Sequence, residues 1–285
     1  MLYKLYNIMS NDSKISIIIE GGLGNQLFKI FCILSHSLEY NKKIILNSTI
    51  PNSNNKNLAS RHTYWNSIFK NIKDCVVSSK INFKTFQEKN CFGYQQLPNF
   101  TNDTLLKGYF QNRKYFEKNY DKIIDILDIN HLQIKIKQKY LKNDSTISIH
   151  FRIGDYKNLN NYVLLDVDYY IKSLKYIAEN DTLNCKDVLV FCETQDRDFV
   201  NSIILQLEDI FINIKFAYCD SSLEDWEQML LMSNCKHNII ANSTFSWWSA
   251  YMNKNKDKII CYPDKYFNKN IRMDGFYPES WIKIV

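Results

Sequence analysis

The strongest constraint on the fold is a regular alternation of apolar strands and amphipathic helices through the second half of the chain. Strands are expected at 146–151, 187–192, 213–218, 237–241 and 257–261, with helices between them at 168–179, 196–207, 224–234 and 245–253. Strands that alternate with helices in this way form a parallel sheet, because each crossover helix returns the chain to the same edge. The second half is therefore predicted to be a parallel sheet covered by helices.

The first half opens with a strand, a glycine turn and a helix. An apolar strand is expected at 15–19, the glycines of 21–24 follow, and apolar residues recur at helical spacing over 25–40. Such a turn lets backbone approach a phosphate closely, although it is also a common tight connection. A dinucleotide fold would need a third glycine where Leu27 stands and an acidic residue where Asn47 stands, so NAD is discounted.

The lysine-rich segment 135–143 is polar and separates the two halves. We place a domain boundary there and expect an N-terminal domain at 1–143 and a C-terminal domain at 144–285. A chain of 285 residues is long enough for two domains, and its 45% hydrophobic and 14% aromatic content excludes a disordered protein.

Charge and cysteine content narrow the functional class. A net charge of +6 from scattered lysines, without a basic stripe, gives no reason to expect nucleic acid as a partner. The eight cysteines form no Cys-x-x-Cys pair, which favours free thiols in a reducing compartment. Residues 1–14 lack the apolar core of a signal peptide, and no run approaches the roughly 20 apolar residues of a membrane helix, so a soluble cytoplasmic protein is expected.

The strand at 146–151 ends in residues that suit anion binding. His150 and Arg152 alternate with apolar neighbours, and a turn follows at Gly154. The carboxyl ends of strands form the ligand crevice of an open α/β sheet, where the planar guanidinium of Arg152 is suited to grip a phosphate. The alternative, that Arg152 pairs with Asp155 in the turn, fits the sequence equally well.

A second candidate anion site lies at 242–246, Asn-Ser-Thr-Phe-Ser, between a strand and a helix. Hydroxyl and backbone N–H groups at a helix N-terminus favour an anion, but Ser243 or Thr244 can equally be a simple N-cap. Trp247 and Trp248 in the following helix fit a core position better than a ligand platform.

Two Asp-x-Asp spacings raise the alternative of a Mn²⁺-dependent enzyme that binds a UDP-sugar through the metal. They are Asp166-Val167-Asp168 and Asp196-Arg197-Asp198. Asp168 and Asp196 both stand where a helix begins, which makes N-capping the preferred interpretation. We therefore predict no metal.

Four motifs in order resemble the α-1,2-fucosyltransferases of glycosyltransferase family 11. They are Gly21-Gly22-Leu23-Gly24-Asn25-Gln26, Gly108-Tyr109-Phe110-Gln111, His150-Phe151-Arg152-Ile153-Gly154-Asp155-Tyr156 and Ala241-Asn242-Ser243-Thr244-Phe245-Ser246-Trp247-Trp248. The resemblance implies a GT-B-like architecture, two Rossmann-like domains with a cleft between them, whose C-terminal tail packs back onto the fold. It also implies an inverting, metal-independent transfer of L-fucose from GDP-fucose to a hydroxyl, usually O2 of a terminal galactose.

The resemblance also assigns roles to individual residues. Arg152, Asp155 and His150 are the expected catalytic group, with Arg152 on the diphosphate of the donor. The expected donor-binding residues are Gly22, Gly24, Asn25, Gln26, His150, Arg152, Gln228, Asn242, Ser243, Thr244, Phe245 and Ser246. Tyr109 and Gln111 are weaker candidates for the acceptor pocket of the N-terminal domain, with packing an equally good interpretation.

Two departures from the family pattern bear on the donor. Ile153 replaces a second arginine, and Gln228 stands where the family has an aspartate that pairs with guanine, unless Glu227, Asp225 or Asp220 takes that role. The general base is open between Asp155, which we favour as a turn-fixing residue, and Glu20. A different nucleotide-sugar transferase and a non-catalytic nucleotide- or sugar-binding protein remain the alternatives.

Overall fold

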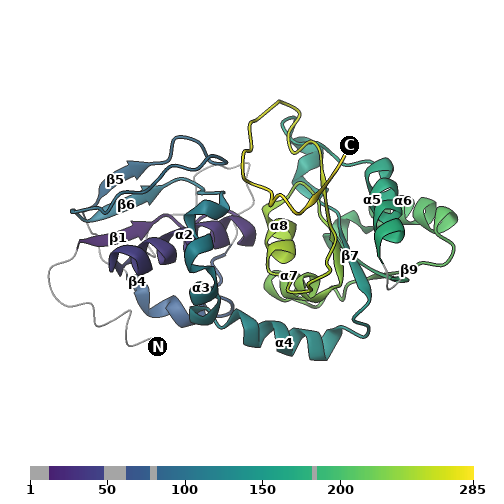
Figure 1. Ribbon diagram of the computed structural model, residues 1–285, viewed down its shortest axis with the longest axis horizontal. Helices are drawn as coiled ribbons and strands as arrows, with labels where there is room; N and C mark the ends of the chain where they lie inside the picture. Colours follow the sequence, from purple (N-terminus) through teal and green to yellow (C-terminus); the bar gives the residue numbers. More distant parts are fainter. Residues whose placement is uncertain (1–12, 48–61, 78–81, 182–184) are drawn as a thin grey trace. The chain divides into compact units, whose positions relative to one another are not determined.

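The computed structural model describes residues 13–47, 62–77, 82–181 and 185–285, so most of the segment 1–14, which carries the signal-peptide prediction, lies outside it. The chain forms two compact units (Figure 1). The first unit comprises Met1–His131 and Arg272–Pro278, and the second comprises Leu132–Ile271 and Glu279–Val285. None of the described helices combines the length and the apolar composition that crossing a bilayer requires.

The second unit is built on a six-stranded sheet in which every pair of neighbours is parallel. Its strands are β7 (Thr146–His150), β8 (Asp187–Phe191), β9 (Lys215–Tyr218), β10 (His237–Ile239), β11 (Ile260–Pro263) and β12 (Ile282–Ile284). Their order is β12-β11-β10-β7-β8-β9. The chain moves outward from β7 through β8 and β9, then returns to the other side of β7 with β10. The switch point of this doubly wound sheet therefore lies between β7 and β10.

Helices connect the strands as the sequence predicts. They are α5 (Val167–Asn180), α6 (Arg197–Ile210), α7 (Asp225–Asn234) and α8 (Thr244–Tyr251), with short 3₁₀ turns η4 (Gly154–Asn158) and η5 (Thr194–Asp196). All five residues of β7 are buried, as expected for the central strand of a sheet covered on both faces. Trp247 and Trp248 are fully buried, which confirms them as core residues.

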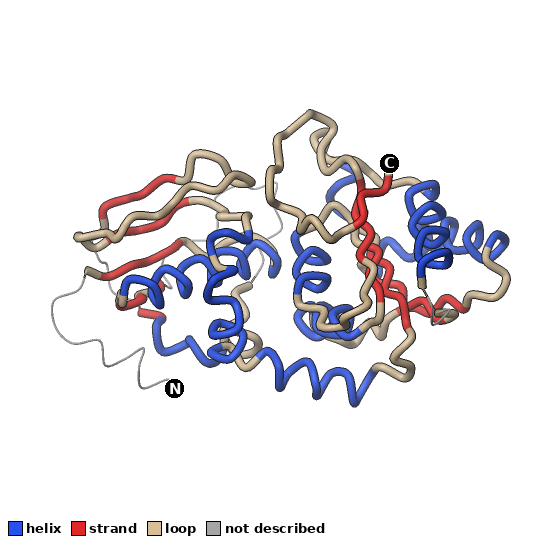
Figure 2. Tube along the Cα trace, in the orientation of Figure 1, coloured by secondary structure: helices blue, strands red, loops and turns tan. Residues whose placement is uncertain are grey.

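The first unit has a smaller parallel sheet in the order β2-β1-β6-β5 (Figure 2). Its strands are β1 (Lys14–Ile17), β2 (Lys43–Ile44), β5 (Lys84–Gln87) and β6 (Thr104–Lys107), and β3 (Leu46–Asn47) pairs separately with β4 (Val76–Val77). Its helices are α2 (Leu23–Tyr40) and α3 (Tyr120–Ile126), with 3₁₀ turns η1 (Lys70–Cys75), η2 (Arg113–Tyr115) and η3 (Glu117–Asn119). Two parallel α/β sheets confirm the predicted pair of Rossmann-like domains.

The segment expected to separate the domains is helical. Residues Ile129–Tyr140 form α4, and the compact units divide within it, between His131 and Leu132. The lysine-rich composition conceals a buried pair, Leu132 and Ile136, at the i,i+4 spacing of one helix face. Gln133 on the same helix donates to Ser233 Oγ at 2.7 Å, which ties α4 to the second unit.

Candidate active site

In the second unit, the predicted donor residues meet at the carboxyl ends of β7 and β10. The His150 ring, at the end of β7, lies 5.4 Å from the Phe245 ring in the first turn of α8. Tyr156 in η4 donates its hydroxyl hydrogen to the Asn242 carbonyl at 3.1 Å. The two motifs are almost a hundred positions apart in sequence, yet they share the switch point, where open α/β sheets bind ligands.

Arg152 is held between two carboxylates. It donates from Nη2 to Asp155 and from Nη1 to Glu193 Oε1 at 2.6 Å, and its guanidinium lies 4.9 Å from the centre of the Tyr156 ring. Burial opposes the charge of Arg152, but the two carboxylates outweigh this effect and raise its pKa. The side chain is 18% exposed, so the cation is fixed in place while part of it remains open to a ligand.

The turn that carries Arg152 is fastened by Asp196, which is only 3% exposed. Its Oδ2 accepts from the Gly154 N–H at 2.7 Å, and its Oδ1 accepts from Lys157 Nζ at 3.0 Å. A methyl group at Gly154, whose φ is +21°, would lie 3.1 Å from Glu193 Oε2. The connection from β8 to α6 thus clamps the connection from β7 to α5.

The prediction that the side chains of Asp168 and Asp196 cap helices is wrong. Asp196 precedes α6, but its carboxylate caps no helix N–H, because its φ and ψ of −97° and −1° are helical rather than extended. At α5 the cap is Asp166, which accepts from the Tyr169 N–H at 3.2 Å, and Asp168 lies in the first turn. Glu193 and Asp196, which sequence reasoning missed as site residues, follow β8 at the same sheet edge as Arg152.

His150 is a neutral histidine. Burial, followed by the nearby charge of Arg152, lowers its pKa to about 3. Its Nδ1 has no hydrogen-bond partner among the described residues, and the residue is 7% exposed. A neutral ring offers one N–H donor and one nitrogen acceptor, which suits hydrogen bonding to a base or a hydroxyl rather than charge pairing.

Most polar side chains of the segment after β10 make hydrogen bonds within the protein. Ser243 is the N-cap of α8 and accepts from the Phe245 N–H at 3.3 Å, which confirms the capping interpretation. Asn242 is fully buried and donates to the carbonyls of Val163 and Tyr266, each at 2.9 Å. Ser246 is fully buried too, so Thr244 and Phe245, which are half-buried, are the more open side chains of this motif.

Gln228 lies in α7 and donates its amide hydrogen to the Leu223 carbonyl at 2.9 Å. Two of the carboxylates considered in its place are engaged locally. Glu227 closes a capping box with Glu224, and Asp220 accepts from the Ser222 N–H at 2.9 Å. The structure shows no hydrogen bond between Gln228 and His150 or Arg152 among the described residues.

In the first unit, the predicted residues gather at the carboxyl ends of β1 and β6. Gln111 donates to Asn25 Oδ1 at 2.9 Å, which joins two of the motifs. Gln26 is fully buried and donates to the carbonyls of Gly21 and His62, each at 2.9 Å. Gly21 has a φ of +84°, which glycine adopts without strain, and the hydrogen bond from Gln26 to its carbonyl holds this turn.

A buried lysine adds a charge that sequence reasoning missed here. Lys29 Nζ lies 3.2 Å from Glu20 Oε1 and 4.6 Å from the centre of the Tyr109 ring. Burial lowers the pKa of Lys29, against the opposing effect of Glu20 and Glu88. Glu88 in turn accepts from the N–H groups of Tyr109 and Phe110 at 2.7 to 3.0 Å. A lysine inside the apolar run Leu27–Phe31 was the available signal, since a buried cation needs a carboxylate partner.

Among the described residues, one group has metal-ligand atoms close together: Asp181, Cys185 and His237, within 4.8 Å of one another. His237 Nδ1 accepts from the Ile259 N–H at 2.8 Å. Nε2 therefore carries the ring proton, and it lies 3.2 Å from Asp181 Oδ1. Neither nitrogen has a lone pair left for a metal, so we interpret the group as structural.

Known proteins are similar to this chain over most of its length. The model of the family described as "Glycosyl transferase family 11" matches residues 49–285. An O-antigen biosynthesis glycosyltransferase, WbnK, from Escherichia coli is 26% identical over 93% of this chain and 99% of that protein. An alpha-1,2-colitosyltransferase from Escherichia coli is 29% identical over 62% of this chain and 61% of that protein. A galactoside 2-alpha-L-fucosyltransferase from Caenorhabditis elegans is 24% identical over 95% and 79%.

The fold is also found in a solved structure. Arabidopsis thaliana FUT1 in complex with GDP aligns with a TM-score of 0.50 at 12% identity, covering 91% of this chain and 72% of that one. This likeness concerns the fold, which is of the GT-B type. Because the family model spans well over half of the sequence, the chain belongs to glycosyltransferase family 11.

Proposed function

We propose that the protein is an inverting fucosyltransferase that moves L-fucose from GDP-β-L-fucose to a hydroxyl of an acceptor glycan, O2 of a terminal galactose. The observation that carries this proposal is the position of Arg152, a fixed and partly open cation at the switch point of a doubly wound sheet. Membership of family 11 and the similarity to a galactoside fucosyltransferase support it.

In the proposed reaction, the acceptor hydroxyl oxygen attacks the anomeric carbon of fucose while the bond from that carbon to the diphosphate breaks on the opposite face. The electron pair of that bond leaves with GDP, so negative charge develops on the diphosphate. Arg152 would stabilise this charge, with the N-terminus of α8 as a second positive end. Its fixed position matters, because a preorganised donor need not reorient during the reaction.

Asp155 is engaged by Arg152, which supports a role in fixing the turn rather than in accepting a proton. The acceptor would be read in the first unit by Gln111 and Tyr109, and Gln111 donates to Asn25, which is expected to bind the donor. Glu20 is 29% exposed, with Oε1 3.2 Å from Lys29 Nζ, which in turn lies 4.6 Å from the centre of the Tyr109 ring. It is the candidate that we favour for accepting the proton of the attacking hydroxyl.

The similarity to a colitosyltransferase favours one second candidate, a colitosyl donor. Colitose lacks one hydroxyl of fucose, so a site that hydrogen-bonds that hydroxyl would discriminate between the two sugars. Competition between the two GDP-sugars for the same enzyme would decide between them.

Calorimetric titration with GDP and UDP in the presence of EDTA tests the donor. Selective binding of GDP without metal supports both the nucleotide assignment and our proposal that transfer needs no metal ion. A preference for UDP would contradict the nucleotide assignment, and binding restored only by Mn²⁺ would contradict metal-independent transfer.

Release of GDP from GDP-fucose in the presence of lactose then tests transfer. Arg152→Ala should lower kcat at least 10²-fold, roughly the effect of losing one preorganised donor. Arg272→Ala is the matched control, since Arg272 is an arginine whose side chain is 85% exposed. Near wild-type turnover in Arg152→Ala would exclude the proposed role.

A further inference from the structure

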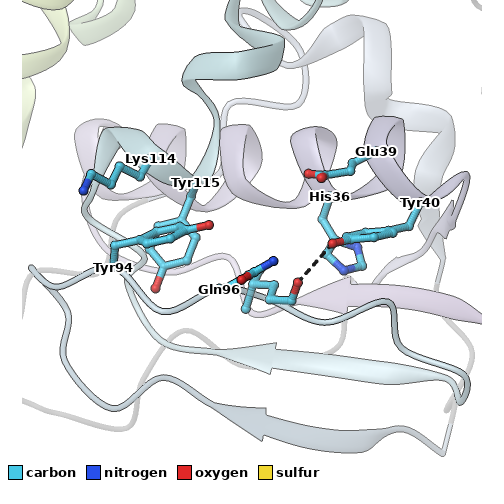
Figure 3. A pocket seen from close by; sticks show the side chains of 8 residues that line it. His36, Glu39, Tyr40, Tyr94, Gln96, Lys114 and Tyr115 are labelled. Atoms are coloured by element: carbon cyan, nitrogen blue, oxygen red, sulfur yellow. Dashed lines mark hydrogen bonds between the residues drawn. The ribbon is translucent and has the colours of Figure 1, made fainter.

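A hollow lies on the first unit at the far end of α2 (Figure 3). It is open to solvent. Three segments line it: the last turns of α2, the stretch 94–97, and η2. Its lining includes His36, Glu39, Tyr94, Gln96 and Tyr115.

The hollow is separate from the residues proposed to read the acceptor. Asn25 lies in the first turn of α2 and Glu39 in its last turn, and a helix rises 1.5 Å per residue, so the two are about 20 Å apart. The hollow is therefore no part of the glycine turn, and the function proposed above does not use it.

Its first notable feature is an exposed aromatic ring. Tyr94 is 47% exposed, and its ring centre lies 5.1 Å from that of Tyr115. Lys114 Nζ lies 6.0 Å from the same ring. The two rings are tilted by 57°, and the exposed apolar face of Tyr94 suits the C–H face of a sugar ring.

Its second feature is a buried acceptor without a donor. His36 Nε2 lies 2.9 Å from the Pro98 carbonyl, which can only accept, so Nε2 carries the proton. Nδ1 is then an acceptor, and it has no hydrogen-bond partner among the described residues, although His36 is only 4% exposed. Burial lowers the pKa of His36, which keeps the ring neutral. A hydroxyl group is the natural donor to such a nitrogen.

The remaining polar groups have the same character. Figure 3 shows the Gln96 amide near the tyrosine rings, and Glu39 Oε1 accepts from Lys118 Nζ at 3.3 Å. Together these groups accept and donate hydrogen bonds around an aromatic surface.

We propose that this hollow is a second glycan-binding subsite, which holds sugar units of the acceptor remote from the hydroxyl that reacts. The acceptor would then be an extended oligosaccharide, bound at its terminal residue in the glycine-turn region and at an interior residue against Tyr94. That the bound glycan is the acceptor rests on the proposed transferase function, whereas the predicted binding of glycan at this hollow does not.

Ligand-observed saturation-transfer NMR with a linear galactose-terminated hexasaccharide tests the subsite without any donor. Wild-type protein should saturate interior sugar protons, and Tyr94→Ala should lose that signal. The matched variant Tyr94→Phe keeps the ring and should retain it. Loss of the signal in both variants, or in neither, would overturn the proposal, and melting curves of the three proteins verify folding.

A kinetic readout then separates the subsite from the transfer step. Tyr94→Ala should raise KM for the hexasaccharide about fivefold to tenfold, the scale of one lost aromatic contact, with kcat unchanged. KM for lactose, which is too short to reach Tyr94, should not move. An equal change for both acceptors would contradict the proposal. If no transfer is found with any donor, the NMR result still decides whether the subsite binds glycan.

Discussion

His150 is kept neutral by its surroundings, and this lowers the stability of the folded protein at acidic pH. An unfolded histidine binds a proton near pH 6.5, whereas burial beside Arg152 lowers the pKa of His150 to about 3 in the folded protein. Between these two values the unfolded state holds more protons than the folded state. The contribution of His150 to stability is therefore complete above about pH 6.5 and is lost as the pH falls toward 3.

We expect His150→Phe to resist acid better than the wild type. Phenylalanine keeps a ring against Phe245 but has no proton to bind. Urea unfolding at pH 7 and at pH 5 should show a smaller loss of unfolding free energy in the variant. An equal loss in both proteins would mean that His150 does not carry this sensitivity.

Single residues differ in how well the sequence predicts them. Arg152 and His150 are evident because they stand at the end of a strand whose alternation is local. Glu193 is not, because it meets Arg152 from 41 positions away, and only the pairing of β7 with β8 brings the two together. The Lys29–Glu20 pair was not predicted for a different reason. The apolar spacing of α2 is that of an ordinary amphipathic helix, in which a lysine is expected on the exposed face.

At the scale of elements, one loop supports another. Asp196, between β8 and α6, holds Gly154 and Lys157 in the loop after β7. We expect Asp196→Asn to cost about 1.5–3 kcal/mol of unfolding free energy, the range for hydrogen bonds to a charged group. Turnover should also fall, because the turn that positions Arg152 is loosened.

Asp198→Asn is the matched control, since Asp198 is exposed two residues later in the first turn of α6. Its free energy of unfolding should change by no more than about 0.5 kcal/mol. Denaturant titration measures both variants. Similar values for the two would show that the clamp at Asp196 contributes nothing.

Elements were predictable where the pattern repeats and less so elsewhere. The strands and helices from β7 to β11 fall within a few residues of their predicted bounds, because apolar runs and helical spacing alternate without interruption. In α4 the buried apolar residues are only Ile129, Leu132 and Ile136, and the lysines among them obscured the helix. β12 is three residues long and pairs only with β11, so its sequence carries little signal.

At the scale of the whole molecule, all eight cysteines are free thiols, as the sequence predicted. Burial raises the pKa of all eight, to about 12 for Cys185, Cys219 and Cys261 and to about 11 for Cys75 and Cys192. Few thiolates are then available at neutral pH, and the thiolate is the reactive form.

The melting temperature should therefore be the same with and without a reducing agent. A thiol reagent should modify the native protein slowly at pH 7, beginning with the half-buried Cys75, Cys91 and Cys192, and should count all eight groups after unfolding in urea. A melting temperature that drops under reduction would reveal a disulfide.

Each unit is built from two separate segments of the chain, and this affects folding during synthesis. Arg272–Pro278 belong to the first unit, where Phe276 stacks on Phe28 at 6.0 Å, and Glu279–Val285 return to the second. During synthesis, the N-terminal half emerges from the ribosome long before the phenylalanine that completes its core. A chain divided once, between His131 and Leu132, would thus leave the first unit without Arg272–Pro278, and a chain that stopped near residue 270 would lack a segment of each unit.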